Sequence, residues 1–468
     1  MSQFLFINPS THKFKGTTSV VLTVPPLGLA SMAAVLESSG HAVQIIDANV
    51  EQIDPEDIVS RVASAPAVIG LTVNILSIRM ALQYGKVLKD AFPEALLVLG
   101  GPQASTLKGQ LLEKSAFVDA VIVGEGEVTI AEIAQRLGSK DVFKDVSGVV
   151  YRDQGLIIDN GLRPFIQDVD SIPIPAYHLL PHLSHYRSRS RATPVGFIVT
   201  SRGCPSACTF CYRSFGDKWR ARSPEKVIEE IALLREVYGI RQLDILDDNF
   251  IADKVRTVKI LEMIIARQWN LKINLQIGVR VHSLDFELLK LMKRAGVFKF
   301  GFGIESGDEA MLRRIKKGLS LDKAIEVVRD ARSLGLITHG YFIIGFPGDT
   351  PESMQKTIDY AKKLDAHYAS FSVCAPLPGT EMMQDILDNG TLVHDVNEGI
   401  DEGLFALKVF FHYRGQDPDQ IVHYCDKAWK EFYFRPGKMG DVLTTIKSWG
   451  ELTWLVRVLR DVLRTKNS

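Results

Sequence analysis

"TSRGCPSACTFCYR" (residues 200–213) holds three of the five cysteines of the chain, Cys204, Cys208 and Cys211. Their spacing is C-x3-C-x2-C, and the apolar run "VGFIV" at 195–199 just before them predicts a strand. Five cysteines among 468 residues are too few for a disulfide framework. The stretch therefore indicates a metal or redox centre in a loop at the end of a strand.

The residues around this stretch alternate between short apolar runs and helical patterns. One helical pattern is capped by Ser223, starts at Pro224 and carries an apolar stripe from Val227 to Tyr238. The predicted strands are "VGFIVTSRG", "LDILDDNF", "NLQIGVRV", "FKFGFGIES", "HGYFIIGFP" and "YASFSVCAPLP". These units are too few for a closed eight-fold barrel. Residues 193–390 are therefore expected to form a partial (β/α)6 barrel, with its chemistry at the carboxyl ends of the strands.

Residues 1–144 predict another α/β domain. Its strand candidates are "FLFINP", "AVQIIDA", "AVIGLTV", "LLVLGGP" and "AVIVGEG", and helical patterns separate them. Strands that are apolar throughout imply a parallel sheet that is covered on both faces. We expect a doubly wound, Rossmann-like domain that binds its ligand at the carboxyl ends of the strands.

Two further segments connect and follow these domains. Residues 145–192 are expected to form a linker that contains a hairpin around Asp153-Gln154-Gly155. Residues 391–468 are expected to be a helical C-terminal domain. Its last helix, "LTWLVRVLRDVLR", has one apolar face that would either pack on the barrel or touch a membrane or a lipid-like substrate.

Composition limits the class of protein. Lys+Arg and Asp+Glu both number 55, so no broad electrostatic surface for nucleic acid is expected. No apolar run approaches the ~18 residues that a membrane-spanning helix needs. The strand pattern begins at "FLFI", residues 4–7, which leaves no room for a signal peptide. These features predict a cytoplasmic protein without nucleic-acid partners.

The three clustered cysteines lack a fourth ligand at short spacing. Structural zinc needs four ligands, but the next cysteine is Cys374. Bacterial ferredoxin clusters use a different run with four cysteines. Three thiolates on a four-iron four-sulfur cluster would leave one iron open, and an open iron can bind a small molecule and pass it an electron.

This stretch resembles the signature of the radical S-adenosylmethionine (radical SAM) superfamily, which has an aromatic residue, here Phe210, before its last cysteine. The resemblance implies that the open iron is chelated by the methionine part of SAM. Reduction by an external donor, a flavodoxin or ferredoxin, would then cleave SAM to methionine and a 5′-deoxyadenosyl radical that abstracts a hydrogen atom.

The resemblance also implies contacts to SAM from strand ends. Phe210 and Tyr212 would face the adenine. Many members carry Gly-Gly-Glu after the second strand, where it contacts the amino group of SAM. Asp247 and Asp248 stand there in this chain, a departure that is common in the cobalamin-dependent branch.

Later strand ends supply further candidates. Arg280 would pair with the carboxylate of SAM, and Glu305 and Ser306 would contact the methionine part or the ribose. Gly345, in "GYFIIGFPGD" (340–349), would let the backbone approach the nucleoside closely.

The first domain resembles the cobalamin-binding domains of radical SAM enzymes. A nicotinamide cofactor would require G-x-G-x-x-G after the first strand, and "INPSTHKFKG" (7–16) lacks it. The candidates for corrin contact follow three successive strands: Thr72, Val73, Asn74, Gly100, Gly101, Pro102, Gly124, Glu125 and Gly126.

Other cobalamin domains supply an axial histidine from Asp-x-His-x-x-Gly after the first strand. Here the position reads Asn8-Pro9-Ser10, with Ser10 in place of the histidine. We therefore expect cobalamin to be bound without a protein histidine on cobalt, and His12 to be a solvated loop residue rather than a ligand.

Three functions follow from these cofactors. The first is methylation of an unactivated carbon of a small or lipid-like metabolite, in which methylcobalamin donates the methyl group and a second SAM restores it. The second is ring formation or rearrangement, as in anaerobic porphyrin-ring cyclases and some natural-product ring-contracting enzymes. The stretch "FYFRP" (432–436) resembles a C-terminal motif of the cyclase-like and hopanoid-associated members of the family. The third is a cofactor-binding sensor without turnover. Cys374 and Cys425 are expected to be buried core residues rather than ligands of a second cluster.

Overall fold

The computed structural model describes residues 2–11, 23–186, 190–394, 396 and 409–453. Within them, the chain divides into two compact units: residues up to Tyr186 form most of the first, and residues 190–394 and 409–453 form the second. His12 and nearly all of the last predicted helix (452–464) lie outside the described residues.

The first unit contains the predicted parallel sheet. Its parallel strands are β1 (Gln3–Asn8), β2 (Ala42–Asp47), β3 (Val68–Thr72), β4 (Leu96–Gly100) and β5 (Ala120–Ile122). They lie in the order β2-β1-β3-β4-β5, so the direction of winding reverses between β1 and β3. The doubly wound prediction is confirmed, and the crevice for a ligand is expected at this reversal.

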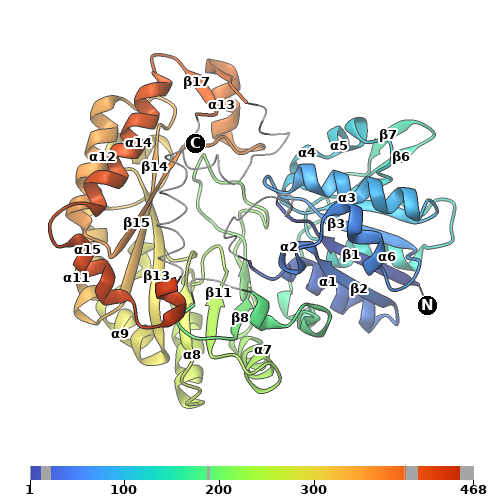
Figure 1. Ribbon diagram of the computed structural model, residues 1–468, viewed down its shortest axis with the longest axis horizontal. Helices are drawn as coiled ribbons and strands as arrows, with labels where there is room; N and C mark the ends of the chain where they lie inside the picture. The colour runs from blue at the N-terminus through green and yellow to red at the C-terminus, as the bar shows by residue number, and fades with distance from the viewer. Residues whose placement is uncertain (1, 12–22, 187–189, 395, 397–408, 454–468) are drawn as a thin grey trace. The chain divides into compact units, whose positions relative to one another are not determined.

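Helices cover both faces of this sheet, as Figure 1 shows. α1 (Leu27–Ser38) and α6 (Glu127–Gln135) pack together on one face. The other face is covered by α3 (Ile78–Ala91), η1 (Pro55–Arg61), α4 (Pro102–Leu107) and α5 (Gly109–Lys114). The strands are apolar throughout because side chains on both faces are buried.

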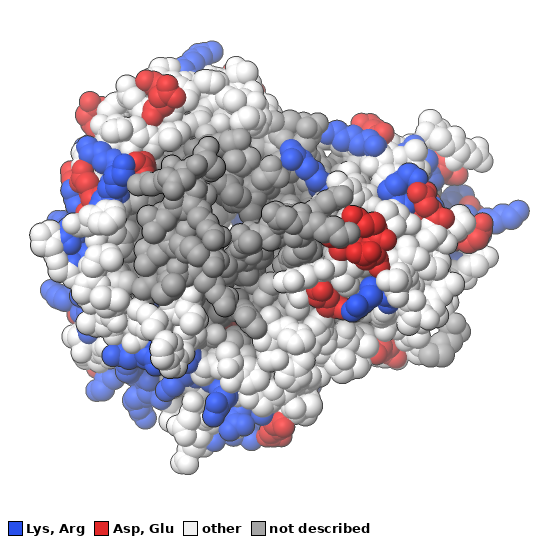
Figure 2. Space-filling view, viewed as in Figure 1, with Lys and Arg blue, Asp and Glu red and all other residues white. Residues whose placement is uncertain are grey.

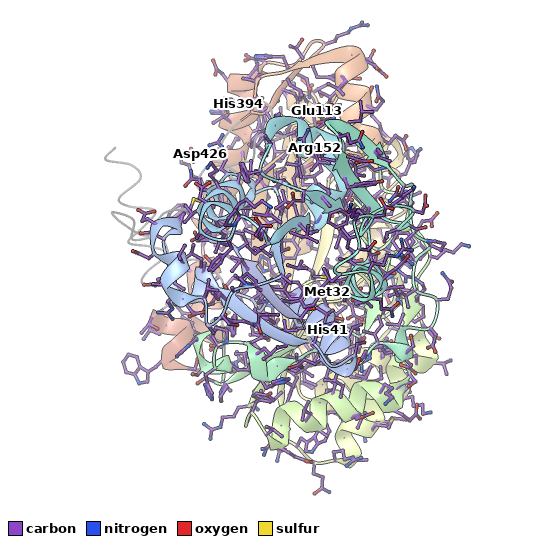
Figure 3. The ribbon with its side chains drawn as sticks, turned by 90° about the vertical axis from the view of Figure 1, so that its right-hand side faces the viewer. Met32, His41, Glu113, Arg152, His394 and Asp426 are labelled. Carbon is purple, nitrogen blue, oxygen red and sulfur yellow. The ribbon has the colours of Figure 1, made fainter. Side chains whose placement is uncertain are left out.

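The predicted hairpin forms, but it extends the sheet instead of belonging only to a linker. β6 (Val149–Asp153) pairs antiparallel with β5, and β7 (Leu156–Asp159) pairs with β6. Arg152, labelled in Figure 3, donates a hydrogen bond to the carbonyl of Leu112 in α5. The hairpin thus covers the edge of β5, which a purely parallel sheet would leave unpaired. Three short 3-10 helices follow: η2 (Val169–Ser171), η3 (Tyr177–Leu179) and η4 (Leu183–His185).

The second unit contains the six predicted parallel strands. They are β8 (Val195–Ile198), β11 (Gln242–Ile245), β12 (Lys272–Leu275), β13 (Val297–Glu305), β14 (Ile337–Ile344) and β15 (Tyr368–Val373). Their order is β15-β14-β13-β12-β11-β8, so the sheet is open between β15 and β8. A short antiparallel pair, β9 (Ser201–Arg202) and β10 (Arg220–Ala221), joins the two ends of the cysteine loop.

The helices between these strands form the outer layer. They are α7 (Pro224–Glu236), α8 (Lys254–Ala266), α9 (Phe286–Ala295), α10 (Glu309–Arg314), α11 (Leu321–Ser333) and α12 (Pro351–Leu364). The Ser223 side chain caps α7 as predicted, but Val237 is 67% exposed, so the apolar stripe ends at Leu234. In the second unit, Figure 2 shows Lys and Arg side chains gathered around α8 and α9.

The described part of the C-terminal segment is mostly helical and contains a small antiparallel strand pair. It consists of α13 (Glu381–Asn389), β16 (Gly390–Leu392), β17 (Phe411–Tyr413), α14 (Pro418–Tyr433) and α15 (Lys438–Thr445). α14 covers the outer edge of β15: Trp429 donates to the carbonyl of Phe371 at 3.0 Å, and the Tyr433 hydroxyl bonds both the N–H and the carbonyl of Ala369. Cys425 of α14 is buried, as predicted. None of the described helices is long and apolar enough to cross a membrane.

Candidate functional site

The cysteine loop is anchored at both ends by buried groups. Gly203 has φ +83, and a Cβ there would lie 2.4 Å from the carbonyl oxygen of Lys218, so only glycine fits this close approach. The amide of Cys204 donates to the carbonyl of Gly216 at 3.4 Å. The loop therefore leaves and re-enters the barrel at fixed points while its three thiols lie between them.

The two aspartates after β11 have different surroundings. Asp247 is buried, and its carboxylate accepts bonds of 2.6 Å from the amide and the hydroxyl of Thr200 and from the hydroxyl of Ser201. Burial raises the pKa of Asp247, although these bonds oppose the rise. Both of its oxygens are thus held by the strand end before the loop, and its contact with SAM stays a prediction. Asp248 differs: its side chain is solvent-accessible beside Gly203, and desolvation and the charge of Asp247 raise its pKa.

Two of the three thiols lie next to each other in an electropositive environment. A hydrogen bond from Cys211, together with the positive charges of Lys317 and Arg280, lowers the pKa of the Cys208 thiol to about 6. The Cys204 thiol donates to the hydroxyl of Ser206 at 3.3 Å. Thiolates are the ligands of iron–sulfur clusters, so the lowered pKa of Cys208 suits cluster binding.

Lys317 is a site residue that the sequence did not reveal. Its ammonium lies 2.7 Å from a carboxylate oxygen of Glu305 and 5.8 Å from the centre of the Phe210 ring. Burial alone would lower the pKa of Lys317, but the ion pair with Glu305 and the two thiols outweigh it and raise the pKa. Twelve residues separate Lys317 from Glu305, and only the path from β13 through α10 brings them together.

This ion pair is built into the barrel with backbone strain and close packing. Glu305 has φ +71, a left-handed conformation that costs a residue with a side chain about 1–3 kcal/mol. A Cβ on Gly303 would lie 2.0 Å from the Glu305 carboxylate and 2.8 Å from the Lys317 ammonium, so a side chain there would displace the ion pair. Arg280 donates to the carbonyl of Lys317 at 2.7 Å. The structure thus brings together the predicted residues Cys208, Arg280 and Glu305.

Phe210 and Tyr212 lie in the cysteine loop, whereas Ser306 is buried at a turn. The Phe210 ring packs 5.5 Å from that of Phe346, and Tyr212 is half-buried in the same loop. Ser306 is buried, with its hydroxyl 3.2 Å from that of Thr357 and accepting from the amide of Asp308, so it caps a turn instead of facing the site.

Gly345 is required for a different reason from the predicted one. A Cβ at its φ of +83 would lie 2.5 Å from the side chain of Ile421 in α14. Asp349 fixes the loop by accepting bonds of 3.0 Å from the amides of Gly345 and Phe346. Burial raises the pKa of Asp349 to about 6. The loop is therefore shaped by helix packing. Cys374, just beyond β15, is buried as predicted, and its pKa is raised by burial and by the charges of Asp349 and Glu305.

The carboxyl ends of β3 and β4 form a backbone-lined cradle in the first unit. Gly101 has φ +99, and its Cβ would lie 2.8 Å from the carbonyl of Val73 and 2.9 Å from the Thr72 hydroxyl. Asn74 accepts bonds from the amides of Leu76 and Ser77 and so starts α3. Val73 is fully buried, and its corrin contact stays a prediction.

Beyond β5, glycine leaves the cradle open. A Cβ on Gly124 would meet nothing within 4 Å, and φ is +84 there. Gly126, in contrast, packs against Met32, with its Cβ position 2.5 Å from the sulfur. The Glu125 carboxylate accepts from the amide of Ile166 at 2.7 Å and thereby holds the segment after the hairpin. Gly100 and Pro102 flank Gly101, and Pro102 begins α4.

Buried polar side chains occupy the end of β1, where other cobalamin domains place a histidine. Ser10 is fully buried, and its hydroxyl lies 3.1 Å from that of Tyr84. Asn8 donates to Asp47 at 2.9 Å, and Tyr186 donates to the other oxygen of Asp47 at 3.0 Å. Burial raises the pKa of Asp47 to about 6. No group of three His, Cys, Asp or Glu side chains able to hold a single metal ion occurs among the residues placed in the structure.

Comparisons with known proteins agree with both sites. Residues 198–361 match the radical SAM superfamily, and residues 16–134 match the B12 binding domain. The chain is 35% identical to the uncharacterized methyltransferase PH0819 of Pyrococcus horikoshii over 93% of each chain. It is 30% identical to cytidylyl-2-hydroxyethylphosphonate methyltransferase of Streptomyces wedmorensis over 82% of each. It is 27% identical to the anaerobic magnesium-protoporphyrin IX monomethyl ester cyclase of Cereibacter sphaeroides, over 82% of this chain and 64% of the cyclase.

The fold agrees as well. The structure of the radical SAM methyltransferase TsrM from Kitasatospora setae, with cobalamin and a 4Fe-4S cluster bound, superposes with a TM-score of 0.71 at 19% identity. The match covers 96% of this chain and 89% of TsrM. The cysteine loop, the partial barrel, the doubly wound first unit and the full-length relatives together show that the chain is an enzyme that belongs to the cobalamin-dependent radical SAM family, with a B12-binding domain before its radical SAM domain.

Proposed function

We propose that this enzyme transfers a methyl group to an unactivated carbon of a small metabolite. The observation that carries the proposal is the group at the carboxyl end of the barrel: the cysteine loop, the Glu305–Lys317 ion pair and Arg280. Two of the relatives are named methyltransferases, and they match this chain over most of both lengths.

In this proposal, Cys204, Cys208 and Cys211 ligate a 4Fe-4S cluster. The donor set fits, since a thiol with a lowered pKa, cations nearby and a loop with fixed ends all favour thiolate ligation. When bound, the cluster and SAM supply a one-electron cleavage that yields a carbon radical able to take hydrogen from an unactivated C–H bond. The electron comes from an external donor, such as a flavodoxin or ferredoxin.

The neighbouring residues hold the methionine part of SAM in place. Its ammonium and carboxylate match the charges of Glu305 and Lys317, which lie only 2.7 Å apart. Arg280, which donates to the carbonyl of Lys317, adds positive charge on the same side. Phe210 and Phe346 form an apolar wall beside Lys317 that excludes water from this side of the site.

The first unit binds cobalamin in the cradle formed by Thr72, Gly101 and Gly124. The fit rests on glycine positions where a side chain would collide with backbone or fill open space. When bound, cobalamin supplies the methyl group. Ser10, held by Tyr84 at 3.1 Å, supports a cobalt without a protein histidine ligand.

The first experiment is anaerobic reconstitution of the full chain with iron, sulfide and cobalamin. Dithionite and SAM carrying a deuterated methyl group are then added, and 5′-deoxyadenosine is measured. Its formation supports radical SAM chemistry, and a product heavier by one labelled methyl group supports methyl transfer. Cluster and SAM binding without any cleavage would contradict the proposal and favour a sensor.

The same experiment tests ring formation, which the cyclase relative keeps as the second candidate. That reaction would remove hydrogens from the substrate or rearrange it without adding label.

The cobalt ligand has its own test: the electron paramagnetic resonance spectrum of cob(II)alamin should lack the nitrogen splitting that a histidine ligand produces.

A further inference from the structure

The inner face of the barrel carries a polar wall just below the Glu305–Lys317 pair. Side chains of β14 and β15 alternate between the two faces of the sheet. Phe342 and Phe371 stack on each other, and Phe371 contacts Trp429 of α14, so this set faces the outer helices. The alternate positions therefore face the barrel interior: Ile337, His339, Tyr341, Ile343, Tyr368, Ser370 and Ser372. Among them, we name His339, Tyr341, Ser370 and Ser372 the inner wall.

The inner wall is internally bonded. The Nε2 atom of His339 lies 2.9 Å from the hydroxyl of Ser370. The His339 and Tyr341 rings are inclined to each other by 30°, with centroids 4.4 Å apart, and the Tyr341 hydroxyl donates to the carbonyl of Gln276 at 3.0 Å. These contacts fix the orientation of an imidazole, a phenol and a hydroxyl on adjacent strands, which is the arrangement of a preorganised recognition surface.

The inner wall continues directly from the proposed SAM site. In the strand register, Gly301 pairs with His339 and Gly303 pairs with Tyr341. A Cβ on Gly303 would touch the Glu305–Lys317 pair, and a Cβ on Gly301 would lie 2.8 Å from the Tyr341 ring. Two residues of a strand span about 6.6 Å, so the two sites are separated by a single layer of side chains.

The wall is polar but still reaches open space. Tyr341, Ser370 and Ser372 are half-exposed, while the outward-facing Phe342 and Phe371 are buried. A hydroxyl or imidazole that faces an apolar ligand would lose its hydrogen bonds with water and gain nothing in return. A lipid chain is therefore a poor occupant of this space, and an oxygen-bearing ligand is a good one.

We infer that the inner wall recognises the substrate, and that the substrate is a small polar metabolite with a hydroxyl or oxyanion group bound by Ser370 and His339. The inference rests on the proposed function, since it takes the radical to form at the Glu305–Lys317 end. It replaces the prediction of a lipid-like substrate. That prediction depended on the helix expected at 452–464, nearly all of which lies outside the described residues.

The test uses the full chain reconstituted with cluster and cobalamin, and extract from the organism that encodes it. The extract is divided into chloroform-soluble lipids, neutral polar metabolites and metabolites retained by an anion exchanger. Each fraction is added with SAM and dithionite, and 5′-deoxyadenosine is measured. We expect a polar fraction to raise the rate several-fold, the neutral fraction indicating a hydroxyl and the retained fraction an oxyanion.

Variants then connect the effect to the wall. Ser370→Ala should raise the half-saturating amount of the active fraction at least tenfold, whereas Ser370→Thr, which keeps the hydroxyl, should restore most of the affinity. Ser333→Ala, on the exposed end of α11, is the matched control. The absorbance of the cluster and the thermal midpoint of each variant report whether the fold is intact.

Two results overturn the inference without touching the proposed function. One is stimulation by the lipid fraction alone, and the other is a wild-type half-saturating amount in folded Ser370→Ala. Absence of 5′-deoxyadenosine with every fraction would instead overturn the proposed function, and this inference with it.

Discussion

The two sheets of this protein prepare their carboxyl ends in opposite ways. In the first unit, Gly101 lets two strand ends pack closely, Gly124 leaves open space, and Asn74 accepts the bonds that close the turn before α3. In the barrel, Cys208, Lys317 and Glu305 place ionisable groups against one another. The site in the first unit is defined by its backbone shape, which suits a large preformed cofactor. The site in the barrel is defined by its charges, which suit bond cleavage.

The sharpest way to separate the two sites is to remove one ligand of the proposed cluster. Cys208→Ala should abolish iron binding and SAM cleavage, while the first unit retains cobalamin. Iron content, 5′-deoxyadenosine and the corrin absorbance measure the three effects. Cys425→Ala, in the core of α14, is the control that should retain both cofactors. Equal iron content in Cys208→Ala and wild type would show that the loop is not the cluster site.

The reverse separation adds one methyl group to the cradle. Gly101→Ala forces a Cβ to 2.8 Å from the Val73 carbonyl at φ +99, which costs about 1–3 kcal/mol and reshapes the cradle. We expect cobalamin binding to weaken roughly tenfold or more, with iron content unchanged. Gly28→Ala in α1, which has open space around it, is the control. Unchanged cobalamin affinity in Gly101→Ala would place the corrin elsewhere.

The charged site can be weakened without removing a ligand. Lys317→Met leaves the buried Glu305 carboxylate without its ion-pair partner, which should cost about 3–5 kcal/mol of stability. The double variant Lys317→Met/Glu305→Gln should recover much of that loss, because no charge then stays uncompensated. Denaturant unfolding of the three proteins measures both effects.

The same variant changes the acidity of the cysteine loop. In cluster-free protein, Lys317 helps to lower the pKa of Cys208 to about 6, so its thiolate is present at pH 7. Lys317→Met removes a positive charge, raises that pKa and should slow alkylation of Cys208 by iodoacetamide near pH 7. If wild type and Lys317→Met are alkylated at the same rate at every pH from 5 to 9, Lys317 does not influence the thiol.

The smallest expected effect concerns the polar cluster in the first unit. Burial raises the pKa of Asp47 to about 6, above its ordinary value of 3.8, so the folded state binds this proton more tightly than the unfolded state. Stability should therefore fall as the pH rises from about 4 to about 6. Asp47→Asn should remove this dependence and raise stability at neutral pH by about 1–3 kcal/mol. Thermal midpoints at pH 4 to 8 measure it, and parallel curves for both proteins would contradict it.

Much of the fold was predictable because each strand is a short apolar run between turn residues. All eleven predicted strands form, and Ser223 caps α7 as its sequence indicates. The hairpin at Asp153-Gln154-Gly155 was also predicted, but its pairing with β5 was not, since a hairpin sequence does not encode which edge it joins.

The candidate site was predictable only where a motif carries the chemistry. The cysteines and the carboxyl-end location follow from spacing and topology. Lys317 was missed because its role depends on the path through α10, and the bonds of Asp247 with Thr200 were missed because they depend on the turn between β8 and β9. The function of a polar residue at a strand end is set by what faces it, and sequence order does not contain that information.

The aromatic pair on α14 gives the C-terminal segment a second role, which is to protect the edge of the barrel sheet. Trp429 and Tyr433 satisfy backbone groups along the outer edge of β15, the position where another chain would add a strand. The stretch "FYFRP", which we first took as a family motif, supplies Tyr433 and thus helps to prevent edge-to-edge self-association. A fragment that ends at residue 390 would keep every proposed cluster ligand and still be expected to aggregate, because its barrel would end in an unprotected strand.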